Sequence, residues 1–539
     1  MPPSERAFDS SATPAAGALP AAALDAAVLL LLVAAAGFAS TFLGQDANWD
    51  LQNYHYYNPW AWWHGRIFDW DVAAAQIQTY HNPLLDLPFL AMVTAAWPPR
   101  VIAFVLAMPA ALAGFFVYKL ATLLLEALPR IERVIALACV VVIGTTSAMG
   151  LGAIANTMNE WPLAALVTFA LWWLVHAHRA DGRIARRALV VAGCAVGIAT
   201  GAKLTAATFA LAMFAAVLVR RWPPQWREAA WFAAGSSLGL AVAYGPWGYA
   251  LWTHFGNPFF PYGNEWFRSP WWEAQAIPGL EYGARSILEF LLSPFAMLAP
   301  PTMQFAEVPY RDGRLALLWA LTLVALTAWV LARSRARGRL TREARWRILG
   351  IFCAVAFVAW TLAFSIYRYL LPLDALSGLA VAALLLALLP RRAALVALTV
   401  CTVGLVATTR IADWGRVPFG ERWFETKSMP IVEPDGLVLI TTGEAVSYLI
   451  PMLPPSSRYV GALNTLVKPH QTSRLATEIR DLVQQHKGEF YQMTHPLTEG
   501  TEVIEMHGLE RTSACAVIIT NMPVSPIEFC RLVRKGQAP

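Results

Sequence analysis

Long, nearly uninterrupted apolar runs occupy most of the first 410 residues of the chain. Several of them, such as Ala22–Leu43, Val101–Leu125 and Ala229–Leu251, reach the ~18–20 residues with which an α-helix crosses a membrane. Of the 539 residues, 57% are hydrophobic and only 14% are charged, against roughly 25% charged residues in an average soluble domain. The sequence therefore predicts a polytopic membrane protein and excludes a soluble enzyme.

Arginines gather in alternate loops, at 130–133, 179–187, 220–227, 391–392 and, with seven arginines, at Arg333–Arg347. The loops between them carry fewer cationic residues, although they are longer in total. Because arginine-rich loops stay in the cytoplasm, we assign these loops to the cytoplasmic side. The net charge of +6 then reflects membrane topology, and no nucleic-acid partner is expected.

Eleven transmembrane helices satisfy this alternation. The apolar stretch Pro83–Trp97 is too short for a span and would reverse every later loop, so it is predicted to be re-entrant or interfacial. The predicted spans are residues 22–43, 101–125, 134–155, 161–178, 186–202, 204–219, 229–251, 314–332, 348–364, 373–389 and 393–409. They place the N-terminus in the cytoplasm and the C-terminal segment outside.

The composition divides the chain into three parts. Residues 1–20 are rich in Ala, Pro and Ser and are predicted to be disordered. Residues 21–410 form the all-α membrane domain, with long outward loops at 44–82 and 252–313. The second loop contains Ile287–Leu298, which is predicted to be an interfacial helix.

Residues 411–539 have the composition of a small, soluble α/β domain on the extracytoplasmic side. Leu437–Thr442 and Cys515–Thr520 have the pattern of strands, and Thr472–His486 that of an amphipathic helix. Cys515 and Cys530 could form a disulfide in an oxidising compartment or remain free thiols, and the sequence leaves both possibilities open.

The first outward loop begins QDANWDLQNYHYYNPWAWWHGR and places two carboxylates, Asp46 and Asp50, directly after the first span. On a helix, Asp50 and Tyr54 would share one face. The tryptophans of the loop are also typical of an aromatic belt at a membrane interface, where aspartates are simply solvated.

This loop resembles the start of the GT-C glycosyltransferases, a superfamily that includes the protein O-mannosyltransferases and the lipid A aminoarabinose transferases. Its acidic residue, the tyrosine four positions later and the closing glycine match Asp50, Tyr54 and Gly65. The following segment, YHNPLLDLPF, is similar to the family's Pro-Pro-Leu segment, with Asn82 in place of the first proline.

Further segments between residues 22 and 410 resemble motifs of the superfamily in the same order. They are NTMNEWPLAAL with Glu160, GIATGAKLT with Lys203, GNPFFPYGNEWF at Gly256–Phe267, and IYRYLLPL with Arg368, Tyr369 and Pro372. Lys203 and Arg368 also interrupt apolar sequence at the outer membrane boundary, where ionisable residues are costly. They could snorkel to the interface, or bind the phosphate of a lipid-linked substrate.

The resemblance implies an inverting hexosyl- or pentosyltransferase of the bacterial inner membrane. Its donor would be a polyprenyl-phosphate sugar, and its acceptor a lipid, glycan or protein. Asp50 would be the general base, and Glu160 a second catalytic carboxylate that orients the acceptor or positions Lys203. The residues expected to bind substrate are Asp46, Tyr54, His55, Lys203, Arg368 and Tyr369.

Metal use varies within the superfamily, and Asp46, Asp50 and Glu160 could ligate one divalent cation, although the prediction favours no metal. The glycines of Gly144–Gly152 lie inside an apolar run and indicate close helix packing rather than a phosphate-binding loop. Two alternatives share the lipid-linked substrate: a transporter or flippase, and a glycan polymerase or ligase.

Overall fold

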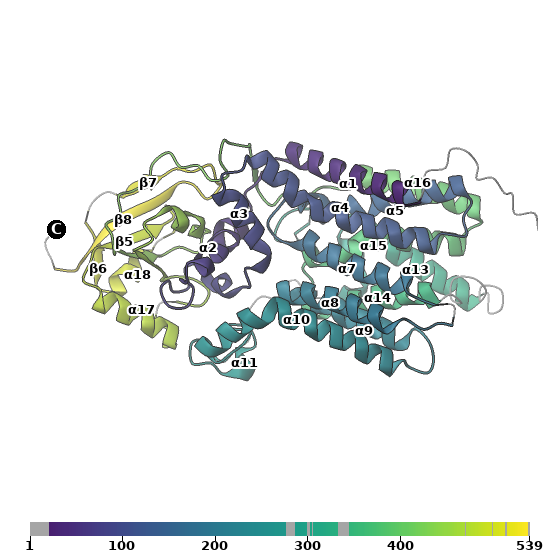
Figure 1. Ribbon diagram of the computed structural model, residues 1–539. Coiled ribbons are helices and arrows are strands. Elements are labelled where there is room, and N and C mark those ends of the chain that lie inside the picture. The colour runs from purple at the N-terminus through teal and green to yellow at the C-terminus, as the bar shows by residue number, and fades with distance from the viewer. Residues whose placement is uncertain are drawn as a thin grey trace, which may run out of the picture.

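The computed structural model describes residues 21–179, 181–275, 286–298, 302–303, 305–331, 344–468, 470–498, 500–512 and 515–536. A bundle of helices forms one end of the molecule and a part built on a β-sheet forms the other, with the short helices α2 and α3 between them (Figure 1). The segment 1–20 and most of the arginine-rich run at 333–347 lie outside the described residues.

Every range predicted to span the membrane overlaps a long helix of the bundle. The helices are α1 (Ala21–Leu43), α4 (Pro99–Leu124), α5 (Arg130–Thr145), α7 (Glu160–His176), α8 (Arg186–Ala202), α9 (Ala207–Val219), α10 (Trp226–Phe255), α13 (Arg314–Leu331), α14 (Ala344–Ala363), α15 (Leu371–Leu388) and α16 (Arg391–Thr408). Within the described part of the chain, six helices are long and apolar enough to cross a membrane. The protein is therefore a multi-pass membrane protein, whereas the number of eleven spans remains a prediction.

The predicted span at 134–155 is wrong in one respect, because the structure divides it into α5 and the short helix α6 (Ala148–Gly152). The Ser147 hydroxyl accepts a hydrogen bond from the Gly150 amide, which starts the new helix. At the end of α5, the buried Arg314 guanidinium donates to the Ile143 carbonyl and to the Thr146 hydroxyl. The bond to the Ile143 carbonyl replaces a helical partner that α5 loses where it ends.

Glycines allow neighbouring helices of the bundle to approach closely. A Cβ at Gly193 or Gly197 of α8 would collide with backbone oxygens of α10. Gly144 of α5 lies in the same way against the Ala375 carbonyl of α15, so the predicted role of this segment in helix packing is confirmed.

Two apolar segments are helical but short. Pro83–Trp97 contains the turn η3 (Leu84–Asp86) and α3 (Leu87–Thr94), whose 8 residues extend only about 12 Å. Ile287–Leu298 contains α12 (Ile287–Ala296), 10 residues long. Both are shorter than a membrane span, as predicted, and their position at the interface stays a prediction.

The sheet has the strand order β4–β3–β5–β8–β6, and β7 also pairs with β8. Its strands are β3 (Leu437–Ile440), β4 (Arg458–Gly461), β5 (Phe490–Thr494), β6 (Leu509–Arg511), β7 (Ala516–Ile518) and β8 (Ile527–Arg534). β3 is parallel to both neighbours, β4 and β5, whereas β8 is antiparallel to β5, β6 and β7. The helices α17 (Arg474–Gln485) and α18 (Thr501–Met506) complete this part. The two strands and the amphipathic helix predicted here are confirmed.

The first loop joins the bundle to the sheet. The strand β1 (Gln45–Asp46) pairs with β2 (Arg416–Val417), which follows α16. Further along, Val72 pairs with Val460 at the edge of β4. Arg66 forms a buried ion pair of 2.8 Å with Asp71 and donates to the Ser457 carbonyl. The first loop, which contains Asp50, is therefore bonded at its start to the segment after α16 and near its end to the sheet.

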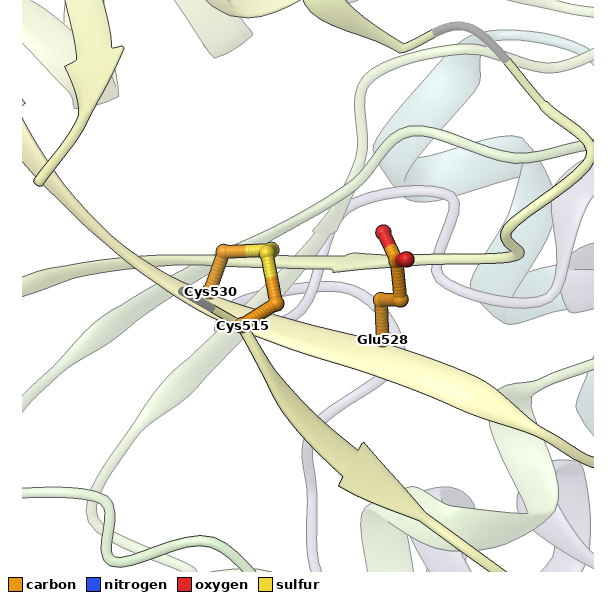
Figure 2. A group of neighbouring side chains, drawn as sticks. All are labelled: Cys515, Glu528 and Cys530. Carbon is orange, nitrogen blue, oxygen red and sulfur yellow. A yellow bond between two sulfur atoms is a disulfide. The ribbon is translucent and has the colours of Figure 1, made fainter. Parts of the chain in front are cut away.

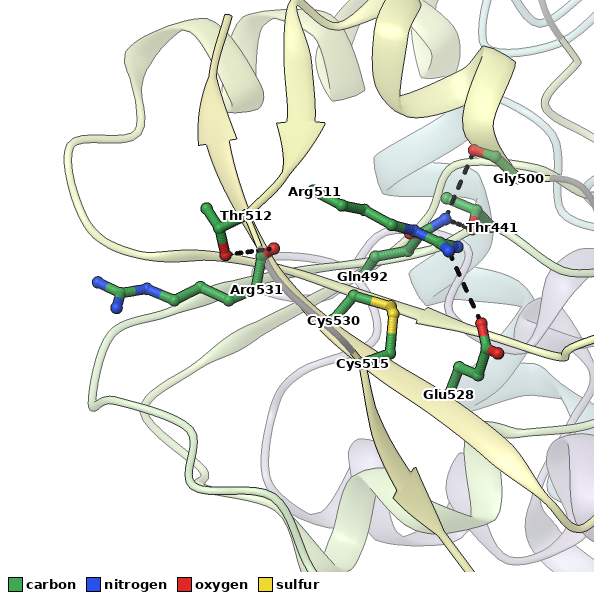
Figure 3. Close-up of a disulfide and its surroundings, with 9 residues drawn as sticks. All are labelled: Thr441, Gln492, Gly500, Arg511, Thr512, Cys515, Glu528, Cys530 and Arg531. Carbon is green, nitrogen blue, oxygen red and sulfur yellow. Dashed lines mark hydrogen bonds and ion pairs between the residues drawn. A yellow bond between two sulfur atoms is a disulfide. The ribbon is translucent and has the colours of Figure 1, made fainter. Parts of the chain in front are cut away.

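Cys515 and Cys530 form a disulfide that joins the start of β7 to β8, which resolves the alternative left open by the sequence (Figure 3). Beside it, Arg511 donates to the Gln492 side chain and lies 3.8 Å from the Glu528 carboxylate. The disulfide thus fixes the last strands of the sheet to each other.

Candidate active site

Lys203 lies where the helix α8 ends, and its extended backbone separates α8 from the next turn, η4 (Leu204–Ala206). Its ammonium donates to the Met158 carbonyl at 3.0 Å and to the Glu160 carboxylate at 2.5 Å. Glu160 is the first residue of α7 and is buried. Two motifs that are 43 residues apart therefore meet in one ion pair.

Arg368 lies in the short turn η6 (Tyr367–Leu370) between α14 and α15. Its Nη1 donates to Asp50 Oδ2 at 2.7 Å, and its Nη2 lies 3.2 Å from a Glu307 carboxylate oxygen. The Nε atom of Arg368 and Oε2 of Glu307 are buried and have no hydrogen-bond partner among the described residues. The guanidinium thus keeps an unused donor next to its carboxylate partners.

Tyr369 brings the two cations together. Its ring centre lies 5.0 Å from Lys203 Nζ and 5.2 Å from Arg368 Cζ, which is within cation–π range. Trp414 contacts the same guanidinium at 5.4 Å. A row of side chains therefore runs from Asp50 through Arg368, Tyr369 and Lys203 to Glu160.

The Asp50 carboxyl is buried among positive charges. Burial by itself raises its pKa, but Arg368, His55 and Lys203 together lower it below the usual aspartate value. Asp50 is therefore ionised at neutral pH. An ionised carboxylate next to two cations can accept a proton from a substrate hydroxyl.

The segment after Asp50 differs from the expected regular helix. Residues Leu51–His55 form a π-helical turn, η1, in which hydrogen bonds join residues five apart rather than four. Tyr54 and His55 are both buried, and their rings lie 4.0 Å apart. Burial, followed by the nearby Asp50 charge, raises the pKa of the Tyr54 hydroxyl well above its usual value.

His81 and Tyr262 form a second pair of aromatic side chains, close to Tyr54 and His55. His81 Nε2 lies 2.8 Å from the Tyr262 hydroxyl, and the two rings are stacked. Burial lowers the pKa of His81 to about 4, so the ring is neutral at pH 7. Burial also raises the pKa of the Tyr262 hydroxyl, and the nearby Tyr369 and Asp50 raise it further.

The structure does not bring Asp46 to the cations. The Asp46 carboxylate accepts hydrogen bonds from Asn48 and from the amide and hydroxyl of Thr157. It holds the first loop to the segment before α7. A role in binding substrate is therefore not supported for Asp46, whereas Tyr54, His55, Lys203, Arg368 and Tyr369 lie together with Asp50 and Glu160.

The three carboxylates considered for a divalent cation do not converge, since Asp46 binds Asn48 and Thr157, Asp50 binds Arg368, and Glu160 binds Lys203. They do not fit a shared metal site. Elsewhere in the described chain, Cys515, Cys530 and Glu528 lie close enough together to hold an ion (Figure 2). The two cysteines are oxidised to a disulfide, however, and metals bind thiolates.

Sequence reasoning missed Glu307, Trp414 and Asp86. Glu307 and Trp414 lie outside every motif, so no sequence signal identified them. Tyr262 belongs to the segment Gly256–Phe267, which resembled a loop motif of bacterial relatives, but the motif alone did not single it out.

The fold of the chain is similar to that of solved structures. No family model and no curated protein matches the sequence. The solved structure of ArnT from Cupriavidus metallidurans bound to undecaprenyl phosphate is similar, with 15% identity and a TM-score of 0.53. The match covers 96% of this chain and 99% of that chain.

The apo structure of the same ArnT matches with 14% identity and a TM-score of 0.53 over 95% of this chain and 98% of that one. The predicted resemblance is thus confirmed at the level of the fold. The apo oligosaccharyltransferase of Archaeoglobus fulgidus has 14% identity and a TM-score of 0.45 over 86% of this chain and 69% of that one, a more distant likeness.

Proposed function

We propose that the protein is an integral membrane glycosyltransferase that moves a sugar from a polyprenyl-phosphate donor to an acceptor in the cell envelope, with inversion at the anomeric carbon. The observation that carries this proposal is the row of charges in which one tyrosine ring, Tyr369, contacts both Lys203 and Arg368. Each of these cations is paired with a carboxylate that can act in transfer.

The two cations suit the phosphate of a lipid-linked donor. Arginine presents a planar fork that matches phosphate oxygens, and lysine adds a point charge. A phosphate that binds Arg368 competes with Asp50 for the same guanidinium, so donor binding frees the carboxylate. As the bond to the sugar breaks, Lys203 and Arg368 stabilise the charge that grows on the leaving phosphate.

The two carboxylates, Asp50 and Glu160, have different roles. Asp50 is the general base that takes the proton of the acceptor hydroxyl, since it is ionised and lies beside the phosphate-binding arginine. Glu160 is a positioning residue that holds Lys203. Tyr54, His55 and Tyr369 bind substrate around them, and no step requires a metal ion.

The structure of ArnT with undecaprenyl phosphate supports a lipid-phosphate donor for this chain as well. The sugar is a hexose or a pentose, and the acceptor is a lipid, a glycan or a protein. The ends of the helices that carry the site face outward from the bacterial inner membrane. Residues 411–539 then form an extracytoplasmic α/β domain next to a membrane domain at 21–410.

Transport of a lipid-linked glycan is a weaker candidate. A transporter places its binding site near the membrane midplane, between broken helices. Here Glu160 begins α7, Lys203 follows the end of α8, and Arg368 lies between α14 and α15. All three are at helix ends, which favours chemistry at one membrane face.

Mass spectrometry of envelope lipids and glycans tests the proposed activity. The source cells are compared with cells that lack the gene and with cells that carry Asp50→Asn. A glycan or lipid that loses one sugar in both altered strains identifies sugar and acceptor together. Identical envelopes in all three strains would contradict a transferase.

A further inference from the structure

Two arginine–carboxylate pairs of this chain show how the fork of a guanidinium is filled completely. Arg66 donates from Nε and Nη2 to the two oxygens of Asp71, both at 2.8 Å. Arg531 donates from the same two atoms to Glu489, both at 2.7 Å. In each pair the Nε and Nη2 atoms form one edge of the guanidinium, and an anion with two oxygens occupies the whole edge.

The same edge of Arg368 is only partly used. Its Nη2 lies 3.2 Å from Glu307 Oε1 and 3.5 Å from the Tyr369 hydroxyl. Arg368 Nε and Glu307 Oε2 are buried, and neither has a hydrogen-bond partner within the described part of the chain. Asp50 is bonded to the remaining nitrogen, Nη1, at 2.7 Å. An anion that binds Nε and Nη2 together must therefore replace Glu307.

Glu307 is the least firmly held of the three carboxylates that pair with the cations of the site. Its side chain is 35% exposed, whereas those of Asp50 and Glu160 are 12% and 3% exposed. Its contact of 3.2 Å is also longer than the 2.7 Å and 2.5 Å of the other two pairs. A carboxylate that is in part hydrated already loses little when its ion pair is broken.

The balance of charge favours the same exchange. Three carboxylates, Asp50, Glu160 and Glu307, are paired with only two cations, Lys203 and Arg368. A phosphate that joined all of them would add a further negative charge to a largely buried group, which is costly. If Glu307 leaves as the phosphate arrives, one anion simply replaces another.

The backbone around Glu307 can stay in place during such an exchange. The Phe305 carbonyl accepts a hydrogen bond of 2.7 Å from the Tyr367 amide, directly before Arg368. Thr302 and Tyr310 pair as an antiparallel bridge on either side of Glu307. Because these bonds fix the segment beside η6, rotation of the half-buried Glu307 side chain is sufficient to uncover the edge.

We propose that Glu307 competes with the phosphate of the donor for the Nε and Nη2 edge of Arg368, and that the phosphate displaces it on binding. This proposal rests on the transferase activity proposed above. Glu307 thus sets the affinity for the lipid phosphate without taking part in the chemistry. The competition with Asp50, which is bonded to Nη1, follows this first exchange.

Binding of undecaprenyl phosphate tests the proposal. The full-length protein in detergent is titrated with undecaprenyl phosphate, and its Kd is measured by native mass spectrometry. Undecaprenol, which has the same chain and no phosphate, is the second probe. The variants are Glu307→Gln and Glu307→Ala, so that one of them decides if the other does not fold.

Both Glu307 variants should bind undecaprenyl phosphate about tenfold more tightly than the wild type, because the competing charge is gone. Their Kd for undecaprenol should stay within twofold of the wild-type value. The matched control is Glu489→Gln, since Glu489 also pairs with an arginine and its side chain is 36% exposed. This control should bind both lipids as the wild type does.

The sign of the change separates competition from a structural role. If Glu307 merely held Arg368 in position, its removal would weaken the binding of undecaprenyl phosphate. Weaker or unchanged binding in the Glu307 variants, or an equal gain for undecaprenol, would overturn the proposal while the transferase activity stands. A wild-type protein and Glu307 variants that all fail to bind undecaprenyl phosphate would instead contradict the proposed function itself.

Discussion

The Asp50 carboxylate accepts a hydrogen bond of 2.7 Å from the Arg368 guanidinium, although the two residues are 318 positions apart in the sequence. This pair joins the loop after the first helix to the turn between α14 and α15. It places the proposed base next to the proposed phosphate ligand, so binding of a phosphate and release of the base become one event.

Substitution of Arg368 tests this coupling. Arg368→Ala should lower the rate of sugar transfer by roughly 10²-fold or more, as the loss of a charge-stabilising donor does. Arg368→Lys should remain impaired, because an ammonium cannot offer the planar, bidentate fork that matches two phosphate oxygens. Release of undecaprenyl phosphate by purified variants is the measurement, and full activity of Arg368→Lys would show that only a positive charge is required.

Lys203 has a well-matched control elsewhere in the bundle. Lys203 and Lys119 are both paired with a carboxylate, and their side chains are 20% and 23% exposed. Lys203→Met should slow transfer by about 10²-fold and weaken binding of undecaprenyl phosphate. Lys119→Met should leave both unchanged, since Lys119 pairs with Asp25 of α1 and with no carboxylate of the site. Equal losses in the two variants would point to a general effect on folding.

Because His81 is buried, we expect the stability of the folded protein to depend on pH. Burial lowers its pKa in the folded protein to about 4, whereas in an unfolded chain histidine titrates near 6.5. The unfolded state therefore binds a proton first, and the folded protein loses stability as the pH falls from about 6.5 to about 4. His81→Gln should reduce this loss. Melting temperatures of both proteins from pH 7 to pH 4.5 measure it, and parallel curves would contradict the shift.

Reporter fusions test the predicted orientation of the protein in the membrane. A reporter that is active only outside the cytoplasm should be active after Pro539 and within Gly256–Asn264, and silent within Arg333–Arg347. The reason is the arginine asymmetry between the loops. An inactive fusion at Pro539 would mean that one span is miscounted, and the Pro83–Trp97 assignment would be the first to change.

The membrane part of the fold could be predicted from the sequence because its signals are local. Apolar runs such as Ala22–Leu43 identify helices, and they coincide with α1 and its neighbours within a few residues. The break after Thr145 could not be predicted, since it depends on the side chain of Arg314, which comes from a distant helix.

The candidate site was predictable only where a residue belongs to a motif. Lys203, Glu160 and Arg368 were identified in this way, and the structure brings them together with Asp50. Asp46 was predicted to bind substrate because it lies in the same loop as Asp50, yet a two-residue strand turns its side chain towards Thr157. Glu307 enters through a tertiary contact alone, which a single sequence does not contain. Asp86 lies in the segment YHNPLLDLPF, but the motif did not single it out.

The Asp50→Asn variant tests the central claim most directly, because the amide keeps the shape of the side chain and cannot take a proton. Purified wild type, Asp50→Asn and the control Asp25→Asn are given undecaprenyl-phosphate-linked sugars and envelope lipids, and release of undecaprenyl phosphate is measured alongside a thermal melt. The account predicts that Asp50→Asn remains folded but transfers sugar about 10²–10⁴-fold more slowly, while Asp25→Asn matches the wild type. A folded and fully active Asp50→Asn protein would contradict it.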